Sequence, residues 1–209
     1  YAYALLASPE YVRIFWDELT IPGPRLPLTK NGATFFQAAE IGKKLIWLHT
    51  YGERFVPPGA TPGKISPAKA RCLRGTPTSS QDYPRNFLYD TETEILYVGS
   101  GEFGPVPSAV WSFSVSGLQV MKSWLDYRKA QGAGKKSSPL DSIRPKSWQF
   151  DDELLDLIWV LEHTVAIQPE LKQVIEAVIR DEIFGANELP EADRSMRAGL
   201  GQLSFGFDT

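Results

Sequence analysis

The stretch Asn86-Phe-Leu-Tyr-Asp-Thr-Glu-Thr-Glu-Ile-Leu-Tyr-Val98 decides the fold class. Two short runs of apolar and aromatic residues flank a polar run from Asp90 to Thr93, which is typical of a β-hairpin with a turn in its middle. Further along, Val110-Trp-Ser-Phe-Ser-Val115 alternates large apolar residues with serine, and this period of two predicts a half-buried strand. We therefore expect a small, mainly antiparallel sheet formed largely by residues 86–115.

Helical patterns surround the predicted sheet. A helix from about Thr34 to His49 carries apolar residues at helical spacing, and shorter helices are expected within residues 1–20. Ser116 and Gly117 are expected to open a helix that ends near residues 128–129. The sheet would thus be flanked by helices from both sides in the sequence, which is an α+β fold.

The C-terminal portion is also predicted to be helical. Asp151 is well suited to cap the start of a helix, and we expect helices at about 151–165 and 169–183. The second would begin at Pro169, because proline fits the first position of a helix. The expected organisation is a helical connection from an upstream domain, an α+β recognition domain and a helical C-terminal portion, at residues 1–30, 31–145 and 146–209.

Composition indicates a globular protein of the cytoplasm. The 209 residues are 12% aromatic, and no apolar run reaches the roughly 18–20 residues needed to span a bilayer. Tyr1 to Leu6 has no initiator Met and no basic segment typical of a signal peptide, so we expect the C-terminal piece of a larger protein, cut within a helix. The one cysteine, Cys72, fits the reducing cytosol of a bacterial cell.

Charge is divided unevenly along the chain, whose net charge is −3. Residues 1–150 hold 18 Lys and Arg against 12 Asp and Glu, whereas residues 151–209 hold 4 against 13. Residues 43–85, here called the basic region, hold eight basic and two acidic residues. From Val56 to Pro84 this region is rich in Pro and Gly, which indicates a long irregular connection. A connection of this length in a compact domain is usually functional or mobile.

Two other patterns resemble sites of catalysis or cofactor binding. Gly99-Ser-Gly-Glu-Phe-Gly104 matches a dinucleotide-binding motif, but that motif requires a helix to begin there and Pro105 follows, so a glycine-rich strand connection is favoured. The acidic residues of the hairpin, Asp90, Glu92 and Glu94, lack the lysine that a nuclease site requires, since Leu96 stands in its place; a solvated turn is favoured.

The remaining titratable residues form no recognisable centre. His49 and His163 are isolated in helical apolar patterns, and one cysteine with two separate histidines cannot supply a structural zinc site. We therefore expect no catalytic residue, no metal and no cofactor in this chain.

Several stretches, taken in their order along the chain, resemble one family. They are Tyr3-Ala-Leu-Leu-Ala-Ser-Pro-Glu-Tyr11 with Asp17-Glu-Leu19 and Pro24-Arg-Leu-Pro27, then Phe36-Gln-Ala-Ala-Glu-Ile-Gly42 with Leu48-His-Thr-Tyr51, then Trp111-Ser-Phe-Ser-Val-Ser-Gly117 with Trp124-Leu-Asp-Tyr-Arg128 and Ser138-Pro-Leu-Asp141. The succession is similar to the C-terminal specificity region of type ISP restriction–modification enzymes and related adenine-N6 DNA methylases, and it covers roughly residues 1–180.

The resemblance implies recognition of double-stranded DNA without catalysis. The Asn/Asp-Pro-Pro-Tyr/Phe motif that holds the flipped adenine is absent, and Asp82-Tyr-Pro84 does not replace it. Methyl transfer, with S-adenosylmethionine, and any cleavage would belong to upstream methyltransferase, helicase-like and nuclease parts of the parent chain. The acidic helices after Asp151 would face away from DNA or dock on another domain.

The basic region is the predicted reader of DNA. Arginine suits bidentate contacts to guanine and lysine suits phosphate, so guanine contacts are expected from Arg71, Arg74 and Arg85 and phosphate contacts from Lys64 and Lys69. The full predicted set is Lys43, Lys44, Arg54, Lys64, Lys69, Arg71, Arg74 and Arg85.

The alternative is a protein-interaction or inter-domain coupling module without base readout. Its partner surface would be anchored by Trp111, Trp124, Trp148 and Trp159, although core packing is favoured for all of them except Trp148.

Overall fold

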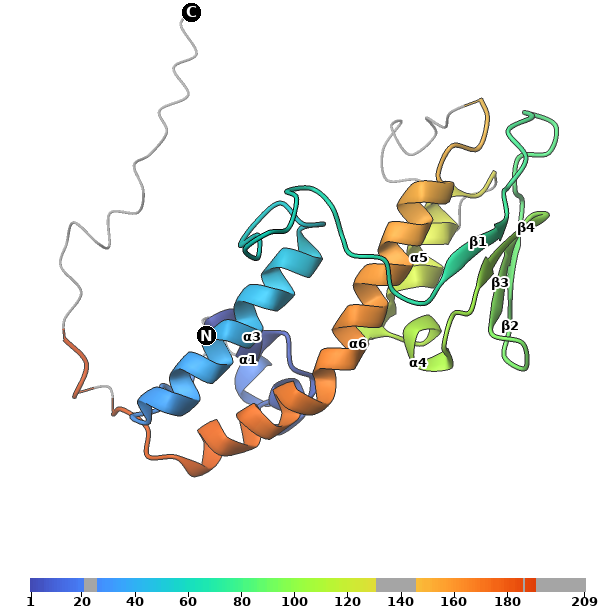
Figure 1. Ribbon diagram of the computed structural model, residues 1–209. Coiled ribbons are helices and arrows are strands. Elements are labelled where there is room, and N and C mark those ends of the chain that lie inside the picture. Colours follow the sequence, from blue (N-terminus) through green and yellow to red (C-terminus); the bar gives the residue numbers. More distant parts are fainter. Residues whose placement is uncertain (21–25, 131–145, 186, 191–209) are drawn as a thin grey trace, which may run out of the picture.

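A small sheet with its covering helices lies at one end of the molecule, and a group of helices lies at the other (Figure 1). The computed structural model describes residues 1–20, 26–130, 146–185 and 187–190. Its elements, in chain order, are α1 (Ala2–Leu6), α2 (Pro9–Ile14), the 3-10 helix η1 (Glu18–Thr20), α3 (Gly32–His49), β1 (Arg71–Arg74), β2 (Phe87–Asp90), β3 (Ile95–Val98), β4 (Gly101–Gly104), α4 (Ser108–Trp111), β5 (Ser114–Val115), β6 (Leu118–Gln119), α5 (Val120–Arg128) and α6 (Asp151–Arg180).

The four longer strands form one antiparallel sheet in the order β1-β4-β3-β2, which confirms the α+β prediction. The predicted hairpin is β2 and β3, in which Phe87 pairs with Val98 and Asp90 pairs with Ile95. Between them the Asp90 carboxylate accepts the Thr93 hydroxyl at 2.8 Å and the Glu92 backbone N–H at 2.9 Å. These bonds, that of Thr93 first, lower the pKa of Asp90. The acidic turn is thus a structural turn.

β1 was not predicted as a strand, because it lies inside the irregular basic region. It pairs with β4, Arg71 opposite Gly104 and Cys72 opposite Phe103, and it forms one edge of the sheet. Three of the four strands, β2, β3 and β4, lie within the expected residues 86–115, but β1 at residues 71–74 also belongs to the sheet and residues 105–115 do not.

One face of the sheet is covered by helices. Leu96 and Phe103 are fully buried there, in a core shared with α4, α5 and the first half of α6. On the opposite face Leu73 and Leu88 remain 54% and 65% exposed, and no helix in the described part of the chain covers them (Figure 1).

The strand predicted at Val110–Val115 is wrong in its first half. Residues 108–111 form the one-turn helix α4, and only Ser114–Val115 is a strand, paired with β6 in a separate ribbon. Val110 is buried and the adjacent Trp111 stacks on Tyr89 with ring centroids 4.8 Å apart. Two consecutive residues can both pack inward on a helical turn but not on an alternating strand.

The start of the next helix was also predicted too early. Ser116 and Gly117 form the turn of the β5–β6 ribbon, both with positive φ, at +50° and +79°. α5 begins at Val120, and Met121 and Leu125 on it are buried as expected. Leu118, expected on the buried side of the helix, is 61% exposed.

The two predicted C-terminal helices are one helix. α6 runs without interruption from Asp151 to Arg180, with Pro169 inside it. Pro169 has no N–H to donate to the carbonyl oxygen of Val165, but its ring is exposed and the apolar stripe continues past it to Leu171 and Val174. The helix changes direction near its middle (Figure 1), as expected for a helix that contains proline.

α6 joins two cores. Its first half, including Leu154 and Ile158, packs with the sheet, and its second half, including Leu171 and Val178, packs with α1, α2 and α3. The boundaries predicted near residues 30 and 145 stay a prediction. Residues 24–25 of the Pro24–Pro27 motif, the linker at 131–138, Ser138–Asp141 and most of the tail after Gly185 lie outside the described residues. Within the described residues, no helix combines the length and apolar character needed to cross a bilayer.

Candidate nucleic-acid interface

Residues 66–76, here called the anchored segment, pass along α6 and are bonded to its side chains. The imidazole of His163 donates from Nε2 to the carbonyl oxygen of Ser66 over 2.8 Å. The indole N–H of Trp159 donates to the carbonyl oxygen of Ala70 at 2.9 Å. These two donors come from one face of the helix, since residues three or four apart share a face.

A carboxylate of α6 completes this part of the attachment. The two oxygens of Glu162 accept the backbone N–H groups of Lys69 and Ala70, each at 3.2 Å. Ala70 is completely buried, so water does not replace this bond. Hydrogen bonds to an ionised acceptor are stronger than bonds between neutral groups, and the attachment therefore fixes the backbone just before β1.

The second attachment corrects the expected role of Asp151. Phe150 occupies the N-cap position of α6, without a side-chain capping bond. The Asp151 carboxylate instead accepts the backbone N–H of Thr76 at 2.8 Å and the indole N–H of Trp148 at 2.6 Å. It thereby holds the end of the anchored segment. Asp151 and Glu162 both bond the backbone that carries the basic residues, and the expectation that the acidic helices after Asp151 face away from DNA or dock on another domain stays a prediction.

The two arginines of β1 are exposed and oriented by local bonds. Arg71 donates from NH1 to two carbonyl oxygens of its own segment, at 2.6 and 2.7 Å. Arg74 donates to the Ser100 carbonyl oxygen at 2.7 Å and pairs with Glu102 at 2.5 Å. Both guanidinium groups are held at the sheet edge with donors left over, because a guanidinium has five N–H donors.

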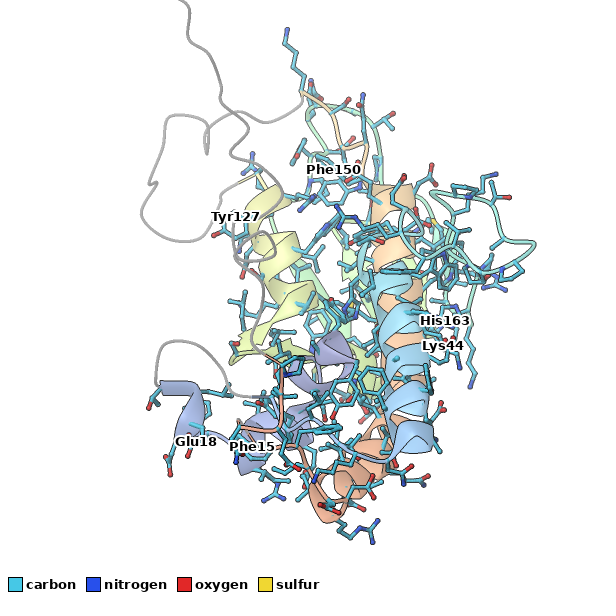
Figure 2. The ribbon with its side chains drawn as sticks, turned by 90° about the vertical axis from the view of Figure 1, so that its left-hand side faces the viewer. Phe15, Glu18, Lys44, Tyr127, Phe150 and His163 are labelled. Carbon is cyan, nitrogen blue, oxygen red and sulfur yellow. The ribbon has the colours of Figure 1, made fainter. Side chains whose placement is uncertain are left out.

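The other residues of the predicted set are exposed as well. Lys43 pairs with Glu40 on α3 at 2.6 Å. For five side chains no ion pair with a described residue is found, namely Lys44, Lys64, Lys69, Arg54 and Arg85. In Figure 2, Lys44 and His163, which bonds the anchored segment, lie toward the same side of the molecule. The structure thus brings Lys69, Arg71 and Arg74 together on one fixed segment. The others lie elsewhere: Lys43 and Lys44 on α3, Arg54 and Lys64 between α3 and β1, and Arg85 just before β2, the opposite edge strand.

The patterns rejected as catalytic sites are structural. Gly99 and Ser100 form the turn between β3 and β4, and Gly101–Gly104 is β4, so the glycine motif is a strand connection. Among the described residues, no group of three or more His, Cys, Asp or Glu side chains could hold a metal ion. Cys72 is exposed on β1, and partial burial of its thiol, with the nearby Asp151 and Asp152, raises its pKa.

His49 is held in place by hydrogen bonds at both of its ring nitrogens. Thr164 donates its hydroxyl to the Val160 carbonyl oxygen, so it accepts from His49 Nε2 at 3.1 Å. His49 Nδ1 then accepts the Tyr3 hydroxyl at 2.7 Å. This arrangement uses the neutral imidazole, and burial lowers the pKa of His49 accordingly.

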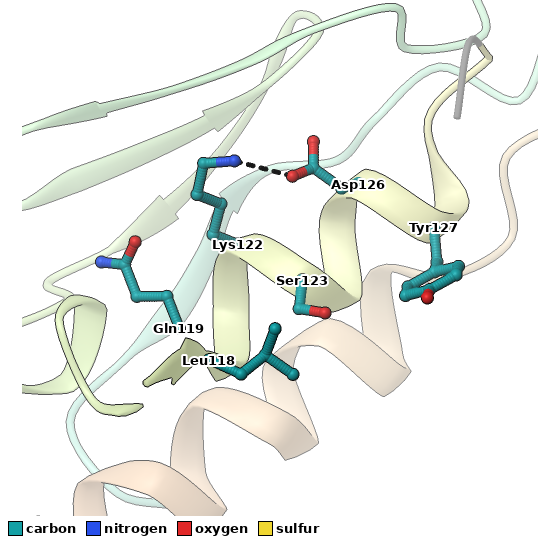
Figure 3. A pocket seen from close by; sticks show the side chains of 6 residues that line it. All are labelled: Leu118, Gln119, Lys122, Ser123, Asp126 and Tyr127. Atoms are coloured by element: carbon teal, nitrogen blue, oxygen red, sulfur yellow. Dashed lines mark hydrogen bonds and ion pairs between the residues drawn. The ribbon is translucent and has the colours of Figure 1, made fainter. Parts of the chain in front are cut away.

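Two surface hollows lie on or beside α5, and neither is lined by a basic residue of the predicted set. Figure 3 shows the first, about 210 Å³, with Lys122 bonded to Asp126 at 2.8 Å across it. The second, about 300 Å³, is lined by Tyr51, Trp124, Arg128, Glu153 and Asp156. Burial, together with the neighbouring acids Asp152 and Glu153, raises the pKa of Asp156 there.

Of the four tryptophans proposed as partner anchors, Trp148 is 1% exposed and belongs to the core, against our expectation.

Comparison with known families identifies the domain to which this chain belongs. The family model of the Type ISP C-terminal specificity domain matches residues 1–158. The chain belongs to this family. The specificity domain assigned here confirms the resemblance read from the sequence. Among the curated proteins, none matches this chain.

Solved structures share the fold of the specificity domain. One is an ATP-dependent Type ISP restriction–modification enzyme, LlaBIII, bound to DNA, with a TM-score of 0.53, 16% identity and 88% of this chain covered. Another is a nuclease-deletion mutant of the Type ISP restriction–modification enzyme LlaGI in complex with a DNA substrate mimic, with a TM-score of 0.50, 20% identity and 88% coverage. This chain spans only 11% and 14% of the length of those two chains.

The attachment of the anchored segment to α6 is not predicted by the sequence. The sequence indicates core packing for Trp159 and a packed or surface position for His163, and it gives no role to Glu162. Their positions three and four residues apart on one helix indicate a shared face, but nothing local shows that a segment some 90 residues away is the partner.

Proposed function

We propose that this domain grips double-stranded DNA and positions upstream parts of its parent chain on a specific sequence. The observation that carries the proposal is the anchored segment, whose backbone is fixed to α6 while Lys69, Arg71 and Arg74 on it remain exposed. Rigid presentation of exposed cations suits DNA recognition, because phosphate contacts fix register and base contacts read sequence.

The family and its relatives support this proposal. The two structural neighbours are enzymes whose complexes contain DNA or a DNA substrate mimic, and they are far longer than this chain. On this proposal the domain itself is not catalytic. Methyl transfer, with S-adenosylmethionine as cofactor, and possible cleavage reside in upstream methyltransferase, helicase-like and nuclease parts, and the protein works in the cytoplasm.

On this proposal the side that carries the anchored segment faces DNA, and its support is the basic region, which holds eight basic and two acidic residues. The net charge of −3 opposes DNA binding by the chain as a whole, because duplex affinity depends on neutralised phosphates. Arg71, Arg74 and Arg85 are proposed to read guanines, and Lys64 and Lys69 to contact phosphate.

Fluorescence anisotropy with labelled duplexes tests the assignment. The domain alone should bind weakly, and log affinity should fall linearly with log salt concentration. Replacing Lys64 and Lys69 with alanine should weaken binding to all sequences alike and reduce the salt slope by about one unit per lost contact. Replacing Arg71 or Arg74 should cost about 1–3 kcal/mol on the recognised site and relax preference there.

Lys172 on the second half of α6 supplies the matched control. Its side chain is 61% exposed and lies 4.0 Å from Glu176, in the half of the helix that packs with α1–α3. Lys172→Ala removes the same charge and should leave binding nearly unchanged. Charge reversal across Lys64–Arg74 without loss of DNA binding by the full parent would refute the assignment.

One observation favours a coupling module as the second candidate. The sheet face opposite the helices exposes Leu73 and Leu88, and Ile95 and Tyr97 alternate onto the same face. A protein surface fits such residues better than DNA does. Loss of domain coupling, with intact DNA binding, after Leu88→Lys would support this candidate.

A further inference from the structure

Glu162 stands out among the acidic residues of α6 because both of its oxygens bond backbone of the anchored segment. The segment residues Ser66–Ala70 belong to no helix or strand, so neither sheet nor helix pairs their N–H groups. Glu162 accepts two consecutive N–H groups, those of Lys69 and Ala70. A buried N–H left without a partner destabilises the structure, so this carboxylate determines where the chain enters β1.

The neighbouring contacts depend on the same placement. Ala70 is bonded on both sides of its backbone: its N–H donates to Glu162, and its carbonyl oxygen accepts the indole N–H of Trp159. His163 holds Ser66 four residues earlier. Ala70 is 0% exposed, whereas Lys69 and Arg71 on either side of it are exposed. Fixing Ala70 therefore fixes the backbone from which the two flanking cations project.

We propose that Glu162 is a positioning residue for DNA binding: an acidic side chain that raises DNA affinity by holding Lys69 and Arg71 in place. This inference rests on the proposed function. It is opposed to simple electrostatics, because a carboxylate beside a DNA-binding segment repels phosphate. The two effects thus predict opposite signs for removal of Glu162.

A positioning role predicts that removal of the Glu162 side chain lowers DNA affinity. If removal of Glu162 leaves the segment in its binding arrangement about one tenth of the time, apparent affinity falls about tenfold. Electrostatics alone predicts that Glu162→Ala binds DNA more tightly, since one negative charge is removed.

The experiment measures binding of a mixed-sequence duplex by the chain of 209 residues and three variants, with an unfolding curve for each. Glu162→Ala removes both acceptors. Glu162→Gln removes the charge but keeps one acceptor oxygen, so it should recover part of the lost affinity. Asp152→Asn is the charge control, because Asp152 is exposed on α6 and acts on Cys72 of β1 through charge. It should bind as tightly as the wild type, or more tightly.

Amide hydrogen exchange without DNA supplies an independent readout. The Lys69 and Ala70 amides should exchange faster in Glu162→Ala and at the wild-type rate in Asp152→Asn. Unchanged exchange in Glu162→Ala, or DNA binding as tight as the wild type, would overturn the inference. Should Glu162→Ala not fold, Glu162→Gln decides by the same two measurements.

Failure of the proposed function is distinguishable from failure of this inference. A wild-type chain that binds no duplex at low salt refutes the DNA interface itself. A wild-type chain that binds, with a Glu162→Ala variant that binds equally well, refutes only the positioning role.

Discussion

Replacement of Pro169 by alanine distinguishes one continuous α6 from two consecutive helices. In the structure Pro169 lies inside the helix Asp151–Arg180 and is exposed, so alanine there changes no buried contact. Alanine restores the N–H that donates to the carbonyl oxygen of Val165 and removes the clash of the proline ring with that carbonyl. Proline in a helix interior is about 3 kcal/mol less favourable than alanine.

We expect Pro169→Ala to raise the free energy of unfolding by about 1–3 kcal/mol, less than the full difference because the bend of α6 already accommodates the proline. For a chain of this size 2 kcal/mol corresponds to an increase in Tm of about 4–8 °C. Urea unfolding followed by circular dichroism measures the change. Glu170→Ala, at the exposed neighbouring position, should stay within about 0.5 kcal/mol of the wild type.

The opposite result would refute a continuous helix. If Pro169 were the first residue of a second helix, its missing N–H would cost nothing and its fixed φ would help. Pro169→Ala would then be neutral or would destabilise the protein by about 0.4–1 kcal/mol, because alanine gives the unfolded chain more freedom.

Three further predictions concern a close approach of two backbone segments, a buried histidine and the absence of methyl transfer. Gly101→Ala should destabilise the protein by about 1–3 kcal/mol, because its Cβ would lie 2.2 Å from Thr76 Oγ1, whereas Gly32→Ala, with nothing within 4 Å, should stabilise it slightly; urea unfolding of both checks this. Burial lowers the pKa of His49, so its contribution to stability is complete above the unfolded value of about 6.5 and declines as the pH falls below it. His49→Gln should reduce the loss of stability between about pH 7 and pH 5, and a constant difference from the wild type over that range would contradict this. The isolated domain should transfer no methyl group from S-adenosylmethionine to mixed-sequence DNA, and protein-dependent incorporation of labelled methyl would disprove it.

Local patterns determined the parts of the fold that were predicted correctly. The β2–β3 hairpin and the helix α3 each depend on contacts between residues near in sequence, so period and turn residues were enough to place them. The predicted start of α3, Thr34, is only two residues from the observed start at Gly32, where the Asn31 side chain accepts the N–H groups of Ala33 and Thr34.

The errors arise where distant contacts decide. β1 has no alternation of its own and becomes a strand because it pairs with β4, about thirty residues later. α4 replaces the first half of an apparent strand because Trp111 stacks on Tyr89. Pro169 resembles a helix start, but the stripe of apolar residues on both sides of it packs on two different cores and keeps α6 continuous.

At the candidate interface, too, the identity of the basic residues could be predicted from the sequence, but the contacts that hold them in place could not. The cations of the basic region could be read from the sequence, because charge density is a property of composition. The way the anchored segment is held could not be read from the sequence. The carboxylates that bond its backbone, those of Asp151 and Glu162, lie in the acidic C-terminal portion of the chain. Residues of opposite charge that are far apart in the sequence therefore meet in space at these two carboxylates. Acidic side chains of α6 bond the backbone of the anchored segment, and this leaves the side chains of Lys69, Arg71 and Arg74 exposed at one edge of the sheet.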